Sequence, residues 1–313
     1  LSRGLGDVYK RQVYDLAVES PLSDAPLLSR RLGLNVRLKR EDMQSVYSFK
    51  LRGAYNKMAQ LGDDQKAVGV ITASAGNHAQ GVAISAQKLG SRATIVMGEN
   101  TPSIKVNAVR DRGAKVVLHG DNYDEASQHA KILCEAQGLV YIPPYDDVDV
   151  IAGQGTIGME IVNQHSEPLD AIFVPVGGGG LVAGVAAYVK YLHPKTKIIG
   201  VEAQGSNCLD AAMRAGRRVR LPIDQLDLFA DGVSVAQIGK ETFKVAKKYV
   251  DDVVVVNVDE ICAAIKDVFE DTRCVAEPAG ALAIAGMKGY VDAHPGMSHV
   301  VSIVSGALSL IHI

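Results

Sequence analysis

The sequence predicts an α/β fold in which mostly parallel sheets are covered by helices. Strand-like and helix-like segments alternate along the chain, glycine-rich or small-residue loops follow two strands, and 313 residues are enough for about two domains. Short apolar runs rich in β-branched residues predict strands at 36–39, 69–72, 93–97, 115–118, 171–176, 197–201, 253–256 and 299–304. Helical patterns lie between most of these strands.

Local residue chemistry predicts where one of these helices begins. Thr101 and Pro102 suit the N-cap and the first turn of a helix, because a hydroxyl accepts a hydrogen bond from a free N–H group and proline lacks that group. We therefore expect a helix that starts at this pair, shortly after strand 93–97.

A loop of small residues, Thr72–Gly81, follows the apolar run 68–71 and precedes a helical pattern that reaches Leu89. Ser74 suits a plain N-cap of that helix. The free N–H groups of the loop equally suit a carboxylate such as that of an amino acid, and Asn77 offers a neutral donor for a phenolic oxygen. This segment alone leaves both interpretations open.

Four consecutive glycines, Gly177–Gly180, lie between strand 171–176 and the helical pattern 181–189. Such a strand, loop and helix N-terminus form an anion site, because unhindered N–H groups converge and the helix dipole favours negative charge. A tight turn is the plain alternative. Gly178–Ala183 also fits the dinucleotide pattern G-x-G-x-x-A, with Glu202 placed about twenty residues on as a ribose-binding acid. A nicotinamide enzyme therefore stays open at this point.

Lys50, in the segment Ser48–Gly53, adds a second chemical feature. Alone it is best explained as a solvated surface lysine. Together with a glycine loop that binds phosphate, its amine matches the requirements of pyridoxal phosphate (PLP) chemistry, in which a lysine forms a Schiff base with the cofactor.

Composition excludes several classes of protein. The net charge of −2 provides no basic field for nucleic acid. Residues 171–189 carry no charge, but four consecutive glycines and a proline within them argue against a membrane helix. No metal-binding motif is present, so no metal site is expected. The cysteines lack C-x-x-C spacing and are predicted to be free thiols in a reducing cytosol: Cys134, Cys208, Cys262 and Cys274.

Several motifs together resemble the fold-type II PLP enzymes (tryptophan synthase β-like), and within them the catalytic part of the biosynthetic threonine ammonia-lyases. The resemblance spans about residues 13–307. Its motifs are the segments 48–54, 72–81, 143–146, 151–156, 175–181 and 304–306. A nicotinamide enzyme would need none of the lysine, asparagine and terminal serine motifs.

The resemblance implies a role for each matching residue. Lys50 would form the Schiff base with the cofactor and then act as base or acid at the substrate α-carbon. Asn77 would bond to the phenolic oxygen of PLP, and Ser305 would meet the pyridine nitrogen and favour elimination over transamination. The remaining implied residues are Phe49 beside the cofactor, Gly177, Gly178, Gly179, Gly180 and Leu181 at its phosphate, Ser74, Ala75, Gly76, Asn77 and His78 at the substrate carboxylate, and Glu277 without a defined role.

Two departures from the related serine racemases narrow the expected activity. Ala75 stands where those enzymes have a serine that protonates the opposite face of the carbanion, so racemisation should be poor. Glu202 and Ser206 match two positions of their metal site, but Cys208 replaces an aspartate, and hard cations prefer oxygen ligands. Glu202 at a capped strand end is the simplest interpretation.

The resemblance also implies an organisation and a setting. Residues 13–53 and 149–307 would form a large PLP-binding lobe, 54–148 a smaller inserted lobe with PLP between the two, and 1–12 and 308–313 non-native ends, with the family's C-terminal regulatory domain absent. The protein would be cytoplasmic and a homodimer or homotetramer. It would convert L-threonine, and more weakly L-serine, into a keto acid and ammonia in isoleucine biosynthesis.

Three alternatives remain from the sequence. One is an L-serine or hydroxyaspartate dehydratase of the same family. Another is an NAD-binding oxidoreductase, supported only by Gly178–Ala183 and Glu202. The third is a non-catalytic module that retains PLP.

Overall fold

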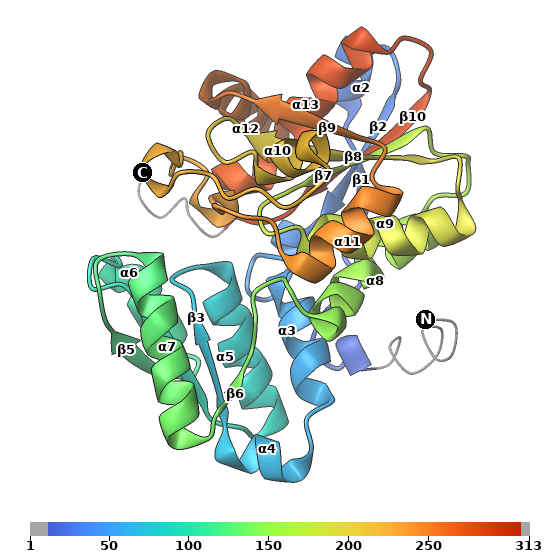
Figure 1. The fold of residues 1–313 in the computed structure, drawn as a ribbon. Coiled ribbons are helices and arrows are strands. Elements are labelled where there is room, and N and C mark those ends of the chain that lie inside the picture. Colours follow the sequence, from blue (N-terminus) through green and yellow to red (C-terminus); the bar gives the residue numbers. More distant parts are fainter. Residues whose placement is uncertain (1–11, 308–313) are drawn as a thin grey trace. The chain divides into compact units, whose positions relative to one another are not determined.

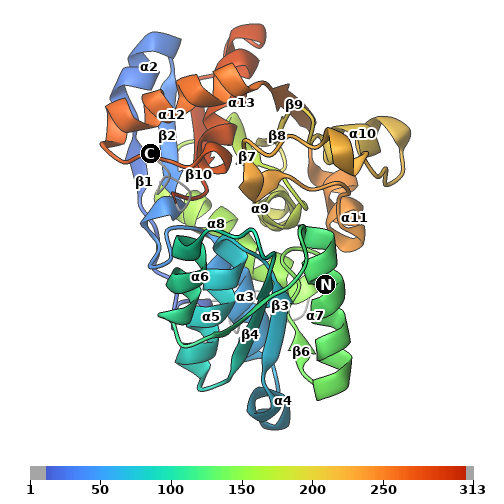
Figure 2. The same cartoon turned by 90° about the vertical axis from the view of Figure 1, so that its left-hand side faces the viewer.

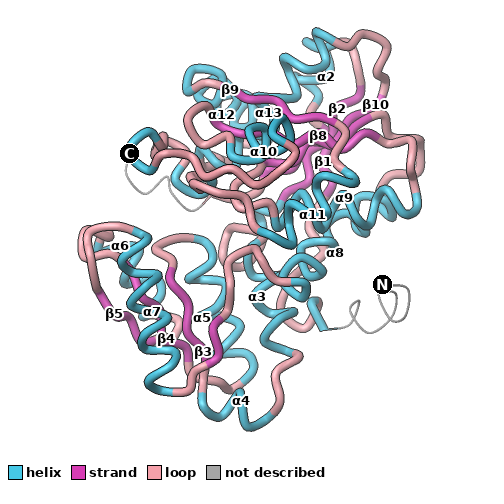
Figure 3. Tube along the Cα trace, in the orientation of Figure 1, coloured by secondary structure: helices cyan, strands magenta, loops and turns pink. Residues whose placement is uncertain are grey.

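The computed structural model describes residues 12–307 and divides the chain into two compact units. Within the described residues, the smaller unit comprises 12–18 and 50–144, and the larger unit comprises 19–49 and 145–307. The expectation that residues 1–12 and 308–313 are non-native concerns residues that, apart from Gln12, lie outside this range. Each unit is a parallel or mostly parallel sheet covered by helices, which confirms the predicted fold class (Figures 1 and 3).

The smaller unit is built on a four-stranded parallel sheet of order β5-β4-β3-β6. Its strands are β3 Val70–Ala73, β4 Ala93–Met97, β5 Lys115–Leu118 and β6 Val140–Tyr141, and its helices are α3 Lys50–Ala59, α4 Asp63–Val68, α5 Asn77–Leu89, α6 Ser103–Arg110 and α7 Tyr123–Gln137. Helices α3, α5 and α6 cover one face of the sheet, and α7 covers the other (Figures 1 and 2). Burial of Met58, Val82 and Ile95 on the first face and of Val96 and Ala130 on the second fixes this arrangement.

The larger unit contains a six-stranded sheet of order β1-β2-β10-β7-β8-β9, in which only β1 is antiparallel to its neighbour. Its strands are β1 Leu22–Asp24, β2 Asn35–Arg40, β7 Ala171–Pro175, β8 Lys197–Ala203, β9 Asp252–Val256 and β10 His299–Val304. Its helices are α2 Pro26–Leu32, α8 Val148–Gln164, α9 Gly180–Leu192, α10 Cys208–Ala215, α11 Lys240–Tyr249, α12 Val258–Thr272 and α13 Pro278–Ala293, with 3₁₀ turns at Glu41–Met43, Ile223–Gln225 and Asp231–Val233.

Two hydrophobic cores lie on opposite faces of this larger sheet. Helices α2, α12 and α13 pack on one face around Phe173 and Leu282, while α8, α9, α10 and α11 pack on the other around Ile172 and Val185. Because residues 172 and 173 are neighbours in β7, their alternation between the two cores shows a strand buried on both sides. This explains the continuous apolar run that predicted the strand.

All eight predicted strands are present, with ends that shift by at most two residues. The short strands β1 and β6 were not predicted. The prediction of Thr101 as an N-cap is wrong, because α6 begins at Ser103 and Pro102 occupies the cap without a side-chain bond. Among residues 12–307, no helix is both long and apolar enough to cross a membrane.

Candidate active site

In the larger unit, strands β7 and β10 pair directly, so the segments after their C-terminal ends lie at one edge of the sheet. The glycine loop follows β7, and Ser305 follows β10. Ligands of parallel α/β sheets bind at such an edge. The fold therefore brings two of the predicted site segments to the same place within this unit.

The glycine loop is packed too tightly for any side chain. A Cβ atom on Gly178 would lie 2.2 Å from the Tyr145 ring, and one on Gly179 would lie 2.6 Å from Ile238 Cδ1. Gly179 also has φ of 91°, in the left-handed region that favours glycine. Glycine is thus required at both positions by contact or conformation.

The same loop leaves donors available. Helix α9 starts at Gly180, and the first intrahelical bond from the helix start is that of the Ala183 N–H to the Gly179 carbonyl. Within the described residues, no protein acceptor is bonded to the N–H groups of Gly178, Gly179 or Gly180, although all three are buried. Buried N–H groups need an acceptor, and at a helix N-terminus an anionic oxygen suits them best.

Ser305 is 4% exposed, and its hydroxyl donates to the Ala279 carbonyl at 3.2 Å. Its backbone carbonyl accepts from the N–H of Phe49, and the bridge between Ser48 and Gly306 continues this contact. The predicted residues Phe49 and Ser305 are therefore held together by the backbone of the larger unit.

Glu277 is also buried in this region. It precedes α13, is 2% exposed, and its N–H donates to the Gly306 carbonyl at 3.1 Å. Gly280 allows the close approach of α13, because a Cβ there would lie 2.0 Å from the Gly306 oxygen. Glu277 and Ser305 thus belong to one packed junction between α13 and the end of β10.

In the smaller unit, Lys50 is the first residue of α3, and its Nζ donates to the Pro144 carbonyl at 3.1 Å. Helix α5 lies directly against this turn, since a Cβ on Gly81 would come within 3.1 Å of the Lys50 carbonyl carbon. Asn77 and His78 lie four and three residues before Gly81, on the face of α5 that Gly81 shares. The unit therefore gathers Lys50, Asn77 and His78 around one helix–helix contact.

The loop before α5 has a defined geometry. Ser74 N–H donates to the Val96 carbonyl, and Ser74 Oγ accepts from the N–H of Gly76 at 3.2 Å. The helix itself begins at Asn77 with Gly76 at its cap. The plain N-cap interpretation of Ser74 is therefore wrong. Its hydroxyl instead bonds within the turn that leads to the cap residue Gly76.

His78 is buried, and its Nε2 lies 3.0 Å from the Ile142 carbonyl. A carbonyl only accepts, so Nε2 carries the proton and Nδ1 presents a lone pair. Burial, reinforced by the charge of Lys50, lowers the pKa of His78 to about 3. The ring is therefore neutral at physiological pH and offers an acceptor rather than a positive charge.

Glu202 lies within β8, and its two carboxyl oxygens accept from the N–H groups of Leu209 and Asp210, each at 2.8 Å. Burial raises the pKa of Glu202 to about 8, although these N–H groups oppose the shift. Both oxygens are thus committed to the start of α10, which supports the interpretation of Glu202 as a capping residue rather than a ribose-binding acid. Cys208 Sγ approaches the Gly177 carbonyl at 3.5 Å. All four cysteines are free thiols, as predicted.

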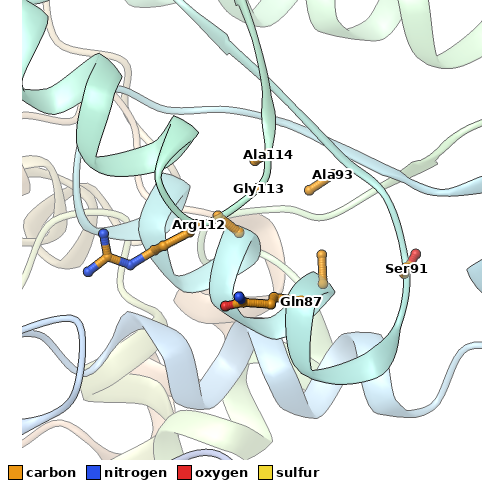
Figure 4. Close-up of a pocket in the computed structure, with 8 residues that line it drawn as sticks. Gln87, Ser91, Ala93, Arg112, Gly113 and Ala114 are labelled. Atoms are coloured by element: carbon orange, nitrogen blue, oxygen red, sulfur yellow. The ribbon is translucent and has the colours of Figure 1, made fainter.

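A separate cavity of about 150 Å³ lies in the smaller unit, between the end of α5 and the turn before β5 (Figure 4). In the close-up, the guanidinium of Arg112 extends away from Ala93 and Ala114. The lining residues are Ala83, Ala86, Gln87, Ser91, Ala93, Arg112, Gly113 and Ala114. None of the predicted site residues is among them.

The fold and these side chains define a class of protein. A family model described as pyridoxal-phosphate dependent enzyme matches residues 13–306, and the chain belongs to this family. The residues present fit the cofactor of the family: buried, unbonded N–H groups of the glycine loop suit a phosphate, and a lysine amine suits an aldehyde.

Individual relatives are more specific. The chain is 57% identical over 305 residues to a biosynthetic chloroplastic threonine dehydratase of Arabidopsis thaliana, covering 97% of this chain and 51% of the relative. It is 56% identical over 301 residues to a biosynthetic L-threonine dehydratase of Pasteurella multocida, covering 96% and 58%. The chain therefore spans only about half to three fifths of the length of these relatives.

Solved structures agree with this placement. The processed form of threonine deaminase isoform 2 from Solanum lycopersicum matches with a TM-score of 0.92 and 52% identity, covering 94% of this chain and 85% of that one. A serine racemase from Dictyostelium discoideum matches with a TM-score of 0.89 and 30% identity, covering 96% and 95%.

Sequence reasoning missed several residues that shape the glycine loop. Tyr145, Asp146 and Thr242 contact the loop or the helix beside it. Two of them, Tyr145 and Asp146, lie within the matched segment 143–146, and this was the only available signal.

Proposed function

We propose that this chain is the catalytic part of a PLP-dependent ammonia-lyase that converts L-threonine into 2-oxobutanoate and ammonia, with L-serine as a weaker substrate. The observation that carries the proposal is the loop of buried N–H groups at the start of α9, combined with more than 50% identity to relatives named as threonine dehydratases. The role in isoleucine biosynthesis, the cytoplasmic location and a homo-oligomeric state belong to the same proposal.

When bound, PLP supplies an electron-withdrawing ring that stabilises negative charge at the substrate α-carbon. Gly177–Gly180 and Leu181 would hold its phosphate with backbone N–H groups, and Phe49 would pack beside it. Asn77 would bond to its phenolic oxygen, and Ser305 would meet its pyridine nitrogen.

Lys50 would provide the amine that holds the cofactor and would take the proton from the substrate α-carbon. The Nζ of Lys50 donates to the Pro144 carbonyl at 3.1 Å, a contact that orients this amine. Ser74, Ala75, Gly76, Asn77 and His78 bind the substrate carboxylate through N–H groups and neutral side chains. Because His78 is neutral, the carboxylate is held by hydrogen bonds from this loop rather than by the charge of its histidine.

An absorption spectrum before and after addition of L-threonine tests the proposal. We expect a visible band that shifts on addition, with release of keto acid. Lys50→Ala should keep the fold and lose turnover by at least about a thousandfold, as expected when a nucleophile and base is removed. Lys88→Ala is the matched control, because Lys88 is exposed at the end of α5 in the same unit. Full activity of Lys50→Ala would contradict the assignment.

A substrate panel distinguishes the proposal from its nearest rival. A fungal L-serine ammonia-lyase matches with a TM-score of 0.84 and 28% identity, so a serine dehydratase remains the second candidate. The two substrates differ by one methyl group, worth about 1–3 kcal/mol. A kcat/KM for L-serine above that for L-threonine would select the rival.

A further inference from the structure

Helix α11 and its N-cap residue form hydrogen bonds with the glycine loop of the larger unit. The carbonyl of Gly178 accepts two hydrogen bonds, from Thr242 Oγ1 at 2.8 Å and from the Gly239 N–H at 3.3 Å. Thr242 is fully buried in the first turn of α11, and the helix packs beside α9 (Figures 1 and 2). The orientation of one peptide group in the loop is therefore set by a side chain 64 residues away.

This orientation has a consequence for the donors of the loop. In a trans peptide, the C=O of one residue and the N–H of the next point in opposite directions. Because the Gly178 carbonyl points to Thr242, the Gly179 N–H points away from α11. No acceptor within the described residues is bonded to that N–H. Thr242 thus turns the buried Gly179 N–H to the side of the loop where none of residues 12–307 accepts from it.

Asp146 fixes Thr242 in turn. Its carboxylate accepts from the N–H of Lys240 at 2.7 Å, of Glu241 at 2.8 Å and of Thr242 at 3.3 Å. The helix has glycine at its own N-cap, Gly239, so this distant carboxylate supplies the cap. The position of Gly239 is itself tight, since a Cβ there would lie 2.5 Å from Asp146 and 2.6 Å from Thr242 Oγ1.

We propose that Thr242 is a positioning residue that aims the Gly179 N–H at the phosphate of the cofactor, and that Asp146 acts through Thr242. The inference rests on the proposed function. Thr242 donates its hydroxyl to the Gly178 carbonyl, so its removal should weaken phosphate binding selectively and leave the remaining contacts of the cofactor intact.

The experiment compares the dissociation constants of PLP and of pyridoxal, which lacks the phosphate, for the apo protein. Thr242→Val keeps the shape and removes the donor, while Thr242→Ser keeps the donor. We expect Thr242→Val to weaken PLP about tenfold, the size of one lost hydrogen bond, and to leave pyridoxal unchanged. Thr242→Ser should restore PLP binding to within about twofold, because one hydroxyl replaces another.

Thr196→Val is the matched control. Its hydroxyl is buried in the same unit and donates to the Leu169 carbonyl at 2.9 Å, before β8. This variant loses an equivalent hydrogen bond elsewhere, so its thermal stability should fall while both dissociation constants stay at the wild-type values. A general effect of destabilisation on binding would appear in this control.

A second variant keeps the test decisive if Thr242→Val does not fold. Asp146→Asn keeps one accepting oxygen and removes the charge, and it should show the same selective loss of PLP over pyridoxal. Unchanged PLP binding in the folded variants, or equal losses of affinity for PLP and pyridoxal, would overturn this inference but not the proposed function. Failure of the wild-type chain to bind PLP would overturn the proposed function and this inference with it.

Discussion

Acid should destabilise this protein through one buried histidine. His78 is 3% exposed and has a pKa of about 3, because burial and then the charge of Lys50 disfavour its protonated form. In the unfolded chain the same ring titrates near pH 6.5. Between these two values the unfolded chain binds one more proton than the folded chain. Lowering the pH through this window therefore favours unfolding, and the contribution is fully present only above about pH 6.5.

The size of the effect follows from that difference. At pH 5, protonation of the unfolded ring lowers the free energy of unfolding by about 2 kcal/mol, and at pH 7.5 the loss is about 0.1 kcal/mol or less. His78→Gln removes the titration and keeps a donor for the Ile142 carbonyl, since an amide nitrogen can take the place of Nε2. The difference in stability between wild type and variant should therefore shift by about 2 kcal/mol from pH 7.5 to pH 5.

Urea unfolding of the apo protein across this pH range measures the difference. His193→Gln, which replaces an exposed histidine after α9, is the matched control. A His78 ring that protonates near pH 6.5 in NMR, or a pH-independent difference for His78→Gln, would refute the reasoning.

Two further predictions concern the packing of the larger unit, and urea unfolding or melting temperatures check both. Lys39→Met should cost about 3–5 kcal/mol, because Lys39 and Glu160 form a 2.6 Å ion pair at 0% and 2% exposure and the variant removes the positive charge that pairs with this buried carboxylate. Adding Glu160→Gln should recover much of the loss, and no recovery would argue against a charge effect. Gly289→Ala should stabilise by about 1 kcal/mol, since nothing lies within 4 Å of the new Cβ in α13, whereas Gly184→Ala should destabilise, its Cβ lying 2.4 Å from the Ile151 carbonyl oxygen.

The strands that the sequence predicted share one physical property. Strands such as β4 and β7 are largely buried, mostly apolar runs that contain several β-branched or aromatic residues, so their local composition favours a strand. The missed strands β1 and β6 have three and two residues, and each pairs with a single neighbour. Such short segments become strands only because a partner edge is available, which is a property of the assembled sheet rather than of the segment.

Helix starts show the same distinction. Thr101 and Ser74 both suit an N-cap, yet α6 and α5 begin later, at Ser103 and Asn77. Hydroxyl residues bond to nearby N–H groups in turns as well as in caps, and Ser74 does so with Gly76. Residue type restricts such a residue to the neighbourhood of a helix start, and tertiary packing then decides which residue is first.

The residues of the candidate site also differ in whether local sequence or tertiary packing determines their role. Lys50, Asn77 and the four glycines occur in short motifs whose chemistry is visible in the residues themselves, so their roles could be predicted and now await experiment. Thr242 lies in no such motif and is a threonine in an ordinary amphipathic helix. Asp146 lies in the matched segment 143–146, but its residue type does not show its role, because it stands 94 residues before the N–H group that it caps. Their relation to the Gly178 carbonyl exists only after β7, α9 and α11 have packed. If Thr242 orients the loop for the phosphate, the phosphate affinity of the loop depends on the Thr242 hydroxyl as well as on the four glycines. A four-glycine run whose carbonyl lacks such a hydrogen bond should then bind phosphate more weakly.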